Sequence, residues 1–178
     1  IPQYAETIIG MDGKEEASFK TLYLLHGLSD DQTIWMRRTS IERYADQYGI
    51  AVVMPAVGRS WYTDMANNAN YFTFVTEELP NICFKTFKQL SDKREDNFVG
   101  GLSMGGYGAL KIALKNPERY AAVAGLSGTL DIADVTRNRP IMEWKSIFGY
   151  DLESTDELYG TKHDNFHLAN TLYKNGGK

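Results

Sequence analysis

The sequence predicts an α/β fold in which a mostly parallel sheet is covered by helices on both faces. Four apolar runs have the character of buried strands, and segments with helical spacing separate them. Regular alternation of strand and helix is typical of parallel sheets, because parallel neighbours need a crossover between them. The chain has 178 residues, 43% hydrophobic and 24% charged, as in an ordinary globular protein. We expect residues 1–178 to belong to a single domain.

The expected strands end at residues that interrupt a sheet or lead into a turn. The first covers residues 19–26 and is followed by Gly27, and the second covers residues 49–55 and is closed by a proline that cannot continue a central ladder. The third and fourth are expected at residues 96–102 and 120–126.

Helical spacing predicts the connections between these strands. Residues 39–42 have the spacing of a capping box, so a helix should start there and stop at Gly49. A longer helical pattern covers residues 70–90, and Pro80 should bend or divide it because proline lacks the N–H that a helix interior needs. Further helices are expected at residues 107–115, 141–148 and 166–173.

Charge and composition exclude several classes of function. The net charge of −4 provides no basic surface for nucleic acid or for an anionic membrane. No apolar run approaches the ~20 residues of a membrane span, and no signal peptide is visible, although the chain opens at Ile1 without an initiator methionine. Cys83 is the only cysteine, which rules out an internal disulfide and favours a reducing, cytoplasmic location.

A Gly-x-Ser-x-Gly turn joins the third strand to the helix that follows it. In this context Ser103 would sit on a turn so tight that the residues two before and two after it must lack side chains, and Gly101 and Gly105 meet that condition. The hydroxyl would then project above the sheet, where an acyl group can reach it. We predict that Ser103 is a catalytic nucleophile, and the alternative is a glycine-rich turn with a structural role only.

A serine nucleophile also needs two backbone N–H donors directed at the oxyanion that forms during acyl transfer. One is expected from Met104, at the N-terminus of the helix, where the helix dipole adds to the effect. The second is expected from Leu28 in the loop after the first strand, with Gly27 as the neighbouring alternative. The same His26-Gly27 pair could instead be a plain turn that ends a strand.

The general base is harder to identify, because the chain has only three histidines. We expect His26 to orient the oxyanion loop and interpret His163 and His167 as solvated residues of a polar helix. The i, i+4 spacing of the latter two also occurs in metal sites, but no clear third ligand accompanies them, so we expect no metal. The conceivable acids, each of which more often caps a turn, are Asp131, Asp134 and Asp151.

Aromatic residues gather after the second strand, around residues 59–64. Loops at the carboxyl ends of parallel strands form the binding face of such sheets. Trp35, Trp61, Tyr62 and Tyr107 are therefore candidates to line an acyl or alcohol pocket. The alternative, equally compatible with the sequence, is that these large side chains cover the edge of the sheet.

Four segments in order carry a resemblance to a known family: residues 22–29, 60–64, 77–80 and 101–108. Together they resemble the esterase D family of α/β-hydrolases, which includes S-formylglutathione hydrolases and bacterial tributyrin or acetyl esterases. The similarity covers most of residues 19–150, and the second segment is more similar to the bacterial short-chain esterases.

The resemblance implies an α/β-hydrolase fold and hydrolysis of short-chain carboxylic esters, acetyl to butyryl, through an acyl-enzyme on Ser103. It implies that Leu28 and Met104 donate to the oxyanion, and that no metal or organic cofactor takes part. A small ester is then the expected ligand. A thioesterase similar to S-formylglutathione hydrolase is the alternative within the family.

Members of this family are longer than the present chain. The resemblance places their catalytic aspartate after a strand that would begin beyond Lys178, and their histidine further on. We therefore expect this sequence to be the middle of an esterase, without the C-terminal strands of the fold and with the first strands preceding Ile1. Such a sheet has an unpaired apolar edge. We expect a second copy or the remainder of the chain to cover it.

Two hypotheses of other kinds stay open. One is a non-catalytic α/β module that uses the same cleft for binding. The other is a complete enzyme with a rewired triad, in which His163 or His167 acts with Asp131 or Asp134. An acyltransferase using the same acyl-enzyme is also open, because the sequence does not say whether water or another alcohol accepts the acyl group.

Overall fold

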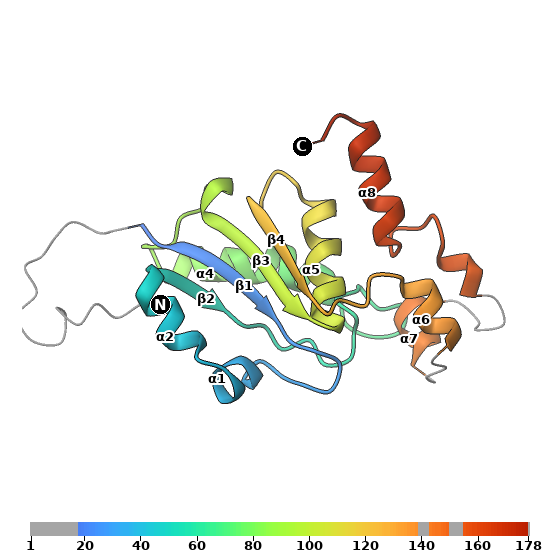
Figure 1. Ribbon diagram of the computed structural model, residues 1–178, viewed down its shortest axis with the longest axis horizontal. Coiled ribbons are helices and arrows are strands. Elements are labelled where there is room, and N and C mark those ends of the chain that lie inside the picture. The colour runs from blue at the N-terminus through green and yellow to red at the C-terminus, as the bar shows by residue number, and fades with distance from the viewer. Residues whose placement is uncertain (1–17, 139–142, 150–154, 178) are drawn as a thin grey trace, which may run out of the picture.

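Four apolar segments form a parallel sheet with the spatial order β2-β1-β3-β4 (Figure 1). The computed structural model describes residues 18–138, 143–149 and 155–177. Each neighbouring pair of strands in the sheet is parallel, which confirms the predicted α/β class. The strands are β1 (Lys20–Leu25), β2 (Ile50–Val53), β3 (Asn97–Leu102) and β4 (Ala122–Leu126), each within one of the four expected segments.

The register of the central strands brings their carboxyl ends together. Leu25 at the end of β1 pairs with Gly101 near the end of β3, and Gly101 pairs in turn with Gly125 in β4. In a parallel sheet all strands end at the same edge, and ligands bind beyond that edge. The loops that begin at His26 and Ser103 are therefore neighbours.

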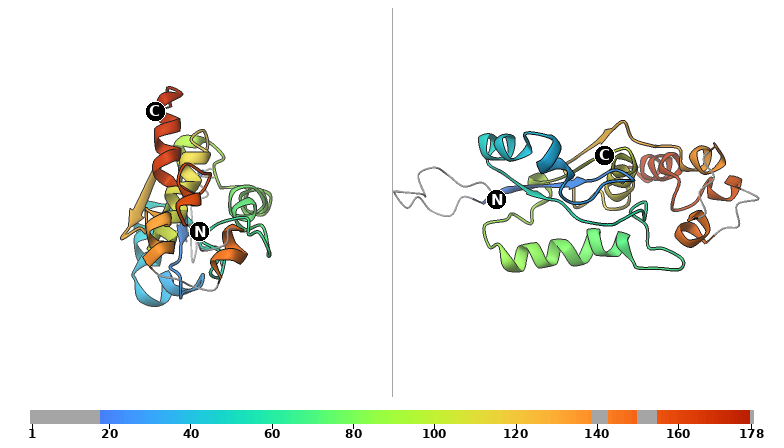
Figure 2. Two further views of the ribbon diagram at one scale, coloured as in Figure 1. Left: turned by 90° about the vertical axis from the view of Figure 1, so that its right-hand side faces the viewer. Right: turned by 90° about the horizontal axis from the view of Figure 1, so that it is seen from below.

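Helices cover the two faces of the sheet. Two helices, α1 (Ile34–Arg38) and α2 (Ile41–Tyr48), connect β1 to β2 and lie on the face opposite α4 (Figure 2). As predicted, α2 ends at Gly49, which adopts a left-handed conformation with a φ of 61°. The expected capping box does not form. Ser40 is the N-cap and makes no side-chain cap, while Thr39 Oγ1 accepts from the Ile41 N–H at 3.2 Å.

The long helical segment between β2 and β3 is divided, as predicted from Pro80. It consists of α3 (Tyr71–Thr73), the π-helical turn η2 (Phe74–Glu78) and α4 (Leu79–Thr86). Pro80 lies in the first turn of α4, where its missing N–H leaves the Thr76 carbonyl without the usual i+4 donor. The Arg119 guanidinium donates to that carbonyl instead.

The C-terminal part is helical. It comprises α6 (Ile132–Asn138), α7 (Trp144–Phe148), the 3₁₀ turn η4 (Thr155–Leu158) and α8 (Asn165–Lys174); another 3₁₀ turn, η3 (Arg94–Asp96), precedes β3. The sequence did not predict α6, and the first residues of the helix expected at 141–148 lie outside the described ranges. The Asp164 carboxylate caps α8, accepting from the N–H groups of Phe166 and His167 at 2.9 and 3.1 Å.

The main core lies between the sheet, α5 (Met104–Lys115) and the C-terminal helices. The expected cover on both faces is incomplete at β4, where all five residues are exposed. Val123 and Leu126 are 38% and 50% exposed, so this outer strand presents apolar side chains. No helix in the described ranges has the length and hydropathy needed to cross a bilayer.

Candidate active site

Ser103 stands between β3 and α5 in a backbone conformation that residues with a side chain rarely adopt. Its φ is 55° and its ψ is −114°. Its N–H donates to the Leu126 carbonyl at 2.9 Å, and its carbonyl accepts from the N–H groups of Tyr107 and Thr129 at 3.1 and 3.3 Å. The strained turn is therefore held both by the following helix and by the end of β4.

The flanking glycines let this turn pack tightly. A Cβ on Gly101 would lie 2.3 Å from the Gly105 carbonyl oxygen, and a Cβ on Gly105 would lie 2.5 Å from the Leu25 carbonyl oxygen. Backbone atoms cannot move aside as a flexible side chain can, so both positions require glycine. The second contact also places the first turn of α5 directly against the end of β1.

The N–H groups of Leu28 and Met104 belong to two segments that meet at this turn. Met104 is the first residue of α5, and Leu28 lies in the loop after β1. That loop reaches the turn, since a Cβ on Gly27 would lie 3.7 Å from the Leu102 carbonyl oxygen. Among the described residues neither N–H has an acceptor, so both can donate to a bound group.

Both ring nitrogens of His26 are occupied within the protein. Its Nε2 accepts from the Val57 N–H at 3.2 Å, which assigns the proton to Nδ1, and Nδ1 donates to the Gly27 carbonyl at 2.8 Å. The His26 carbonyl accepts from the Tyr62 hydroxyl at 3.0 Å. His26 thus joins the loops after β1 and β2, as expected of a residue that orients a loop.

His163 is buried, so the expectation that it is a solvated helix residue is wrong. It packs beside Lys111 of α5, a buried lysine that the sequence analysis missed. The Lys111 Nζ donates to Thr63 Oγ1 at 2.6 Å and lies 3.4 Å from the His163 Nδ1. Since Met104, Tyr107 and Lys111 share one face of α5, their spacing was a signal that this lysine is buried.

Burial controls the ionisation of this pair. It lowers the pKa of Lys111 well below its ordinary range, with the charges of Lys115 and Lys162 acting in the same direction. The pKa of His163 falls to about 2, again because of burial first and Lys111 second. His163 is therefore a neutral ring near physiological pH.

The other residues of the rewired-triad hypothesis lie in structural roles. His167 is exposed on α8. The Asp131 carboxylate accepts from the Asp134 N–H at 3.0 Å and caps the start of α6, as expected, while Asp151 lies outside the described residues. In the described ranges no histidine makes a hydrogen bond to Ser103, and no group of three metal-ligating side chains is present.

Three of the four aromatic residues considered as pocket lining are core residues. Trp61, Tyr62 and Tyr107 are 3%, 0% and 0% exposed, and the rings of Trp61 and Tyr107 meet edge to face with centroids 5.6 Å apart. Trp35 is half-buried on α1, and its Nε1 donates to the Leu25 carbonyl at 3.2 Å. These side chains support the loops around the Ser103 turn, which corresponds to the second interpretation more closely than to an open pocket.

A hollow of about 210 Å³ lies between the loop after β2 and α7. Arg59 and Glu143 form part of its wall and make an ion pair, with the Nε and Oε1 atoms 2.9 Å apart. The two residues are 84 positions apart, and no local sequence pattern connects them.

The sequence model of the "Putative esterase" family matches residues 10–176. The acetyl esterase of Caldicellulosiruptor saccharolyticus is 37% identical over 119 residues, which cover 66% of this chain and 44% of that protein. The chain spans about half the length of the curated relatives it matches.

Two solved structures from Staphylococcus aureus are similar along the whole described fold. One is FphF, a fluorophosphonate-binding serine hydrolase solved with substrate, with a TM-score of 0.85, 35% identity, and coverage of 99% of this chain and 67% of that one. The other is FrmB, an S-formylglutathione hydrolase, with a TM-score of 0.80, 34% identity, and coverage of 100% and 67%.

Proposed function

Because the chain belongs to this esterase family, we propose that the protein hydrolyses short-chain carboxylic esters through an acyl-enzyme on Ser103. The observation that carries the proposal is the conformation of Ser103. A strained φ at the N-terminus of a helix, between two glycines that cannot bear a Cβ, is the geometry of a nucleophile elbow. The fold around it is the parallel sheet of the serine hydrolases to which the chain is similar.

In the proposed reaction the Ser103 hydroxyl oxygen attacks the ester carbonyl carbon while a general base takes the hydroxyl proton. The N–H groups of Leu28 and Met104 donate to the carbonyl oxygen as it becomes an oxyanion. The alcohol leaves with a proton and the acyl group stays on Ser103, until water releases it as a carboxylic acid. The chemistry requires no metal or organic cofactor. The likeness to an acetyl esterase supports the acetyl end of the proposed range, acetyl to butyryl.

Labelling with a fluorophosphonate tests the nucleophile. We expect the intact mass to increase by one adduct, and the increase to disappear in Ser103→Ala. Ser127→Ala is the matched control, because Ser127 is an exposed serine that also follows a strand and also has a positive φ, of 45°. An adduct that persists in Ser103→Ala would contradict the proposal, as would an unlabelled protein when the chain tested includes the catalytic histidine expected beyond Lys178.

The likeness to FrmB supports one alternative, a thioesterase that acts on S-acyl substrates such as S-formylglutathione. Oxygen esters and thioesters with the same acyl group distinguish the two. Faster turnover of the acetyl and butyryl oxygen esters supports the carboxylesterase, and faster turnover of the thioester supports the alternative. Acyl transfer to an added alcohol, detected as a new ester, would identify an acyltransferase.

A further inference from the structure

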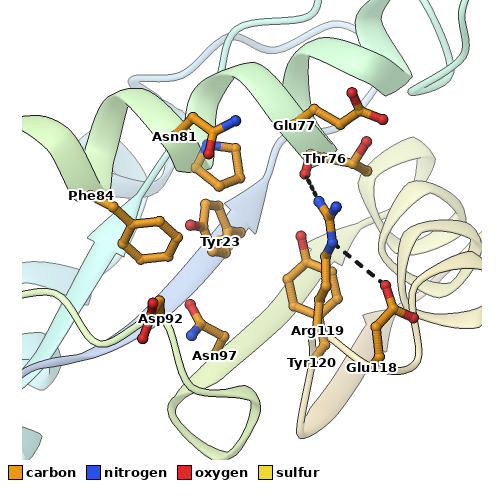
Figure 3. Close-up of a pocket in the computed structure, with 11 residues that line it drawn as sticks. Tyr23, Thr76, Glu77, Asn81, Phe84, Asp92, Asn97, Glu118, Arg119 and Tyr120 are labelled. Carbon is orange, nitrogen blue, oxygen red and sulfur yellow. Dashed lines mark hydrogen bonds and ion pairs between the residues drawn. The ribbon is translucent and has the colours of Figure 1, made fainter.

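A second hollow, of about 390 Å³, lies between α4 and the sheet and opens beside the first residue of β3 (Figure 3). Asn97 begins β3 and lines this hollow, whereas Ser103 follows the last residue of the same strand. Six strand residues span about 20 Å, so the hollow is at the opposite end of the sheet from the elbow. An ester bound at Ser103 would leave it empty.

Two buried polar atoms in the wall of this hollow have no hydrogen-bond partner among the described residues, Tyr23 Oη and Asn97 Oδ1. Tyr23 and Asn97 are only 1% and 4% exposed. The orientation of the Asn97 amide is determined, because its Nδ2 donates to the carbonyls of Ser91 and Lys93 at 2.9 and 2.8 Å. Its oxygen therefore remains an acceptor without a donor. Buried groups of this kind almost always have a partner in folded proteins.

Among the described residues that line the hollow, acidic side chains outnumber basic ones. Glu77 and Asp92 line it, and in the described part of the chain neither makes an ion pair. The one cation among the described lining residues, Arg119, is already engaged with Glu118, at 3.5 Å, and with the Thr76 carbonyl (Figure 3).

Aromatic rings supply the apolar part of the wall. Tyr23 and Tyr120 meet edge to face with centroids 6.0 Å apart, and Phe84 of α4 lies on the other side of Tyr23 (Figure 3). Burial raises the pKa of both tyrosines, that of Tyr120 to about 12, so their hydroxyls stay protonated and neutral. The faces of aromatic rings attract cations.

We propose that this hollow binds a small organic ammonium compound with an apolar body. An ammonium group in the hollow would find two buried oxygens that lack a donor, Asn97 Oδ1 and Tyr23 Oη, and is attracted by Glu77 and Asp92. The body of the ligand packs against Phe84 and the tyrosine rings. An anion would face unpaired carboxylates, and a neutral alcohol would leave them unused. The volume is within the range of small-ligand sites.

Amide chemical shifts of the full 178-residue chain, titrated with benzylamine at pH 7, test the proposal. We expect saturable shifts at residues lining the hollow, with a Kd of about 1 mM, because few atoms are buried in such a complex. Benzyl alcohol has the same ring without the charge, and we expect it to bind at least fivefold more weakly. No saturable shift up to about ten times the expected Kd, or equal binding of the alcohol, would overturn the proposal.

The variant Tyr23→Phe tests whether the Tyr23 hydroxyl contacts the ligand or has a structural role only. The substitution removes only the unpaired hydroxyl, so we expect an unchanged or higher unfolding temperature together with about fivefold weaker benzylamine binding. Tyr48→Phe, at an exposed position on α2, is the control and should leave the affinity unchanged. Wild-type affinity in Tyr23→Phe would show that the hydroxyl does not contact the ligand and would overturn the assignment.

Discussion

Replacing Lys111 with methionine should stabilise the protein and should remove one component of its dependence on pH. Lys111 is 2% exposed, and burial keeps its folded-state pKa well below that of the unfolded chain, about 10.4. Between these two pKa values the unfolded state binds one more proton than the folded state. The free energy of unfolding of the wild type therefore rises with pH in this window, by about 1.4 kcal/mol per pH unit. Methionine has a similar length and does not titrate.

The expected difference in the free energy of unfolding between the variant and the wild type at pH 7.5 is the sum of two opposing contributions. For an amine that is neutral in the folded protein at pH 7.5, the cost to the wild type is about 4 kcal/mol, because this pH is about three units below the unfolded pKa. The methionine variant recovers this free energy but loses the Nζ donation to Thr63 Oγ1, which contributes about 1 kcal/mol. Thr63 keeps its own hydrogen bond to the Trp61 carbonyl at 3.0 Å. We expect the variant to be more stable by about 2–3 kcal/mol.

Urea unfolding of both proteins, followed by tryptophan fluorescence, measures this difference. We expect it to shrink by about 2 kcal/mol between pH 7.5 and 9, as the wild type gains stability that the variant does not. The neighbouring His163 is neutral throughout this range, since its pKa is lowered to about 2, while Asp64 and the partly buried Lys115 are present in both proteins. Lys85→Met on α4 is the control, because an exposed amine is hydrated in both states. A difference that stays constant with pH would refute the reasoning and would show that Lys111 remains charged in the folded protein.

Two further predictions concern the turn and the outer strand. Gly101→Ala should lower the unfolding temperature by more than 10 °C or prevent folding, because its Cβ would lie 2.3 Å from the Gly105 carbonyl oxygen. Gly100→Ala is the control and should cost about 1 kcal/mol or less, because the atom nearest to its Cβ would lie at 3.5 Å. Equal shifts of the two unfolding temperatures in calorimetry would show that the contact with Gly105 is not the cause. The double change Val123→Lys and Leu126→Lys should shift the protein toward monomer in sedimentation velocity, because these residues are 38% and 50% exposed on the outer strand. Self-association that is unchanged by the two lysines would place the contact elsewhere.

Local patterns were sufficient to predict the sheet and the turn but not the contacts between distant segments. The strands were predictable because their apolar runs are continuous, and the position of Ser103 because only glycines fit beside it. The helix after the elbow starts at Met104, three residues earlier than predicted, since Gly105 and Gly106 have low helix propensity and are required by packing.

The residues that the sequence patterns missed or misplaced depend on partners far along the chain. Lys111 contacts groups 48 and 52 positions away, Thr63 and His163, and no periodicity within one helix reports such neighbours. For the aromatic residues after β2 the sequence leaves two interpretations open, the lining of a pocket or cover for the edge of the sheet. The structure places Trp61 and Tyr62 in the core, and both adopt positive φ angles, of 52° and 49°, which no propensity predicts.

The hydrogen bonds that hold the Ser103 turn also determine when the turn can form during synthesis. The carbonyl of Leu126 and the N–H of Thr129 complete the strained conformation, and both residues follow Ser103 in the chain by more than 20 positions. Until the ribosome has released that segment, only the Tyr107 N–H of the following helix holds the turn, and part of the strain of about 1–3 kcal/mol is not offset. The nascent chain therefore completes the Ser103 turn late, after β4 has docked beside β3.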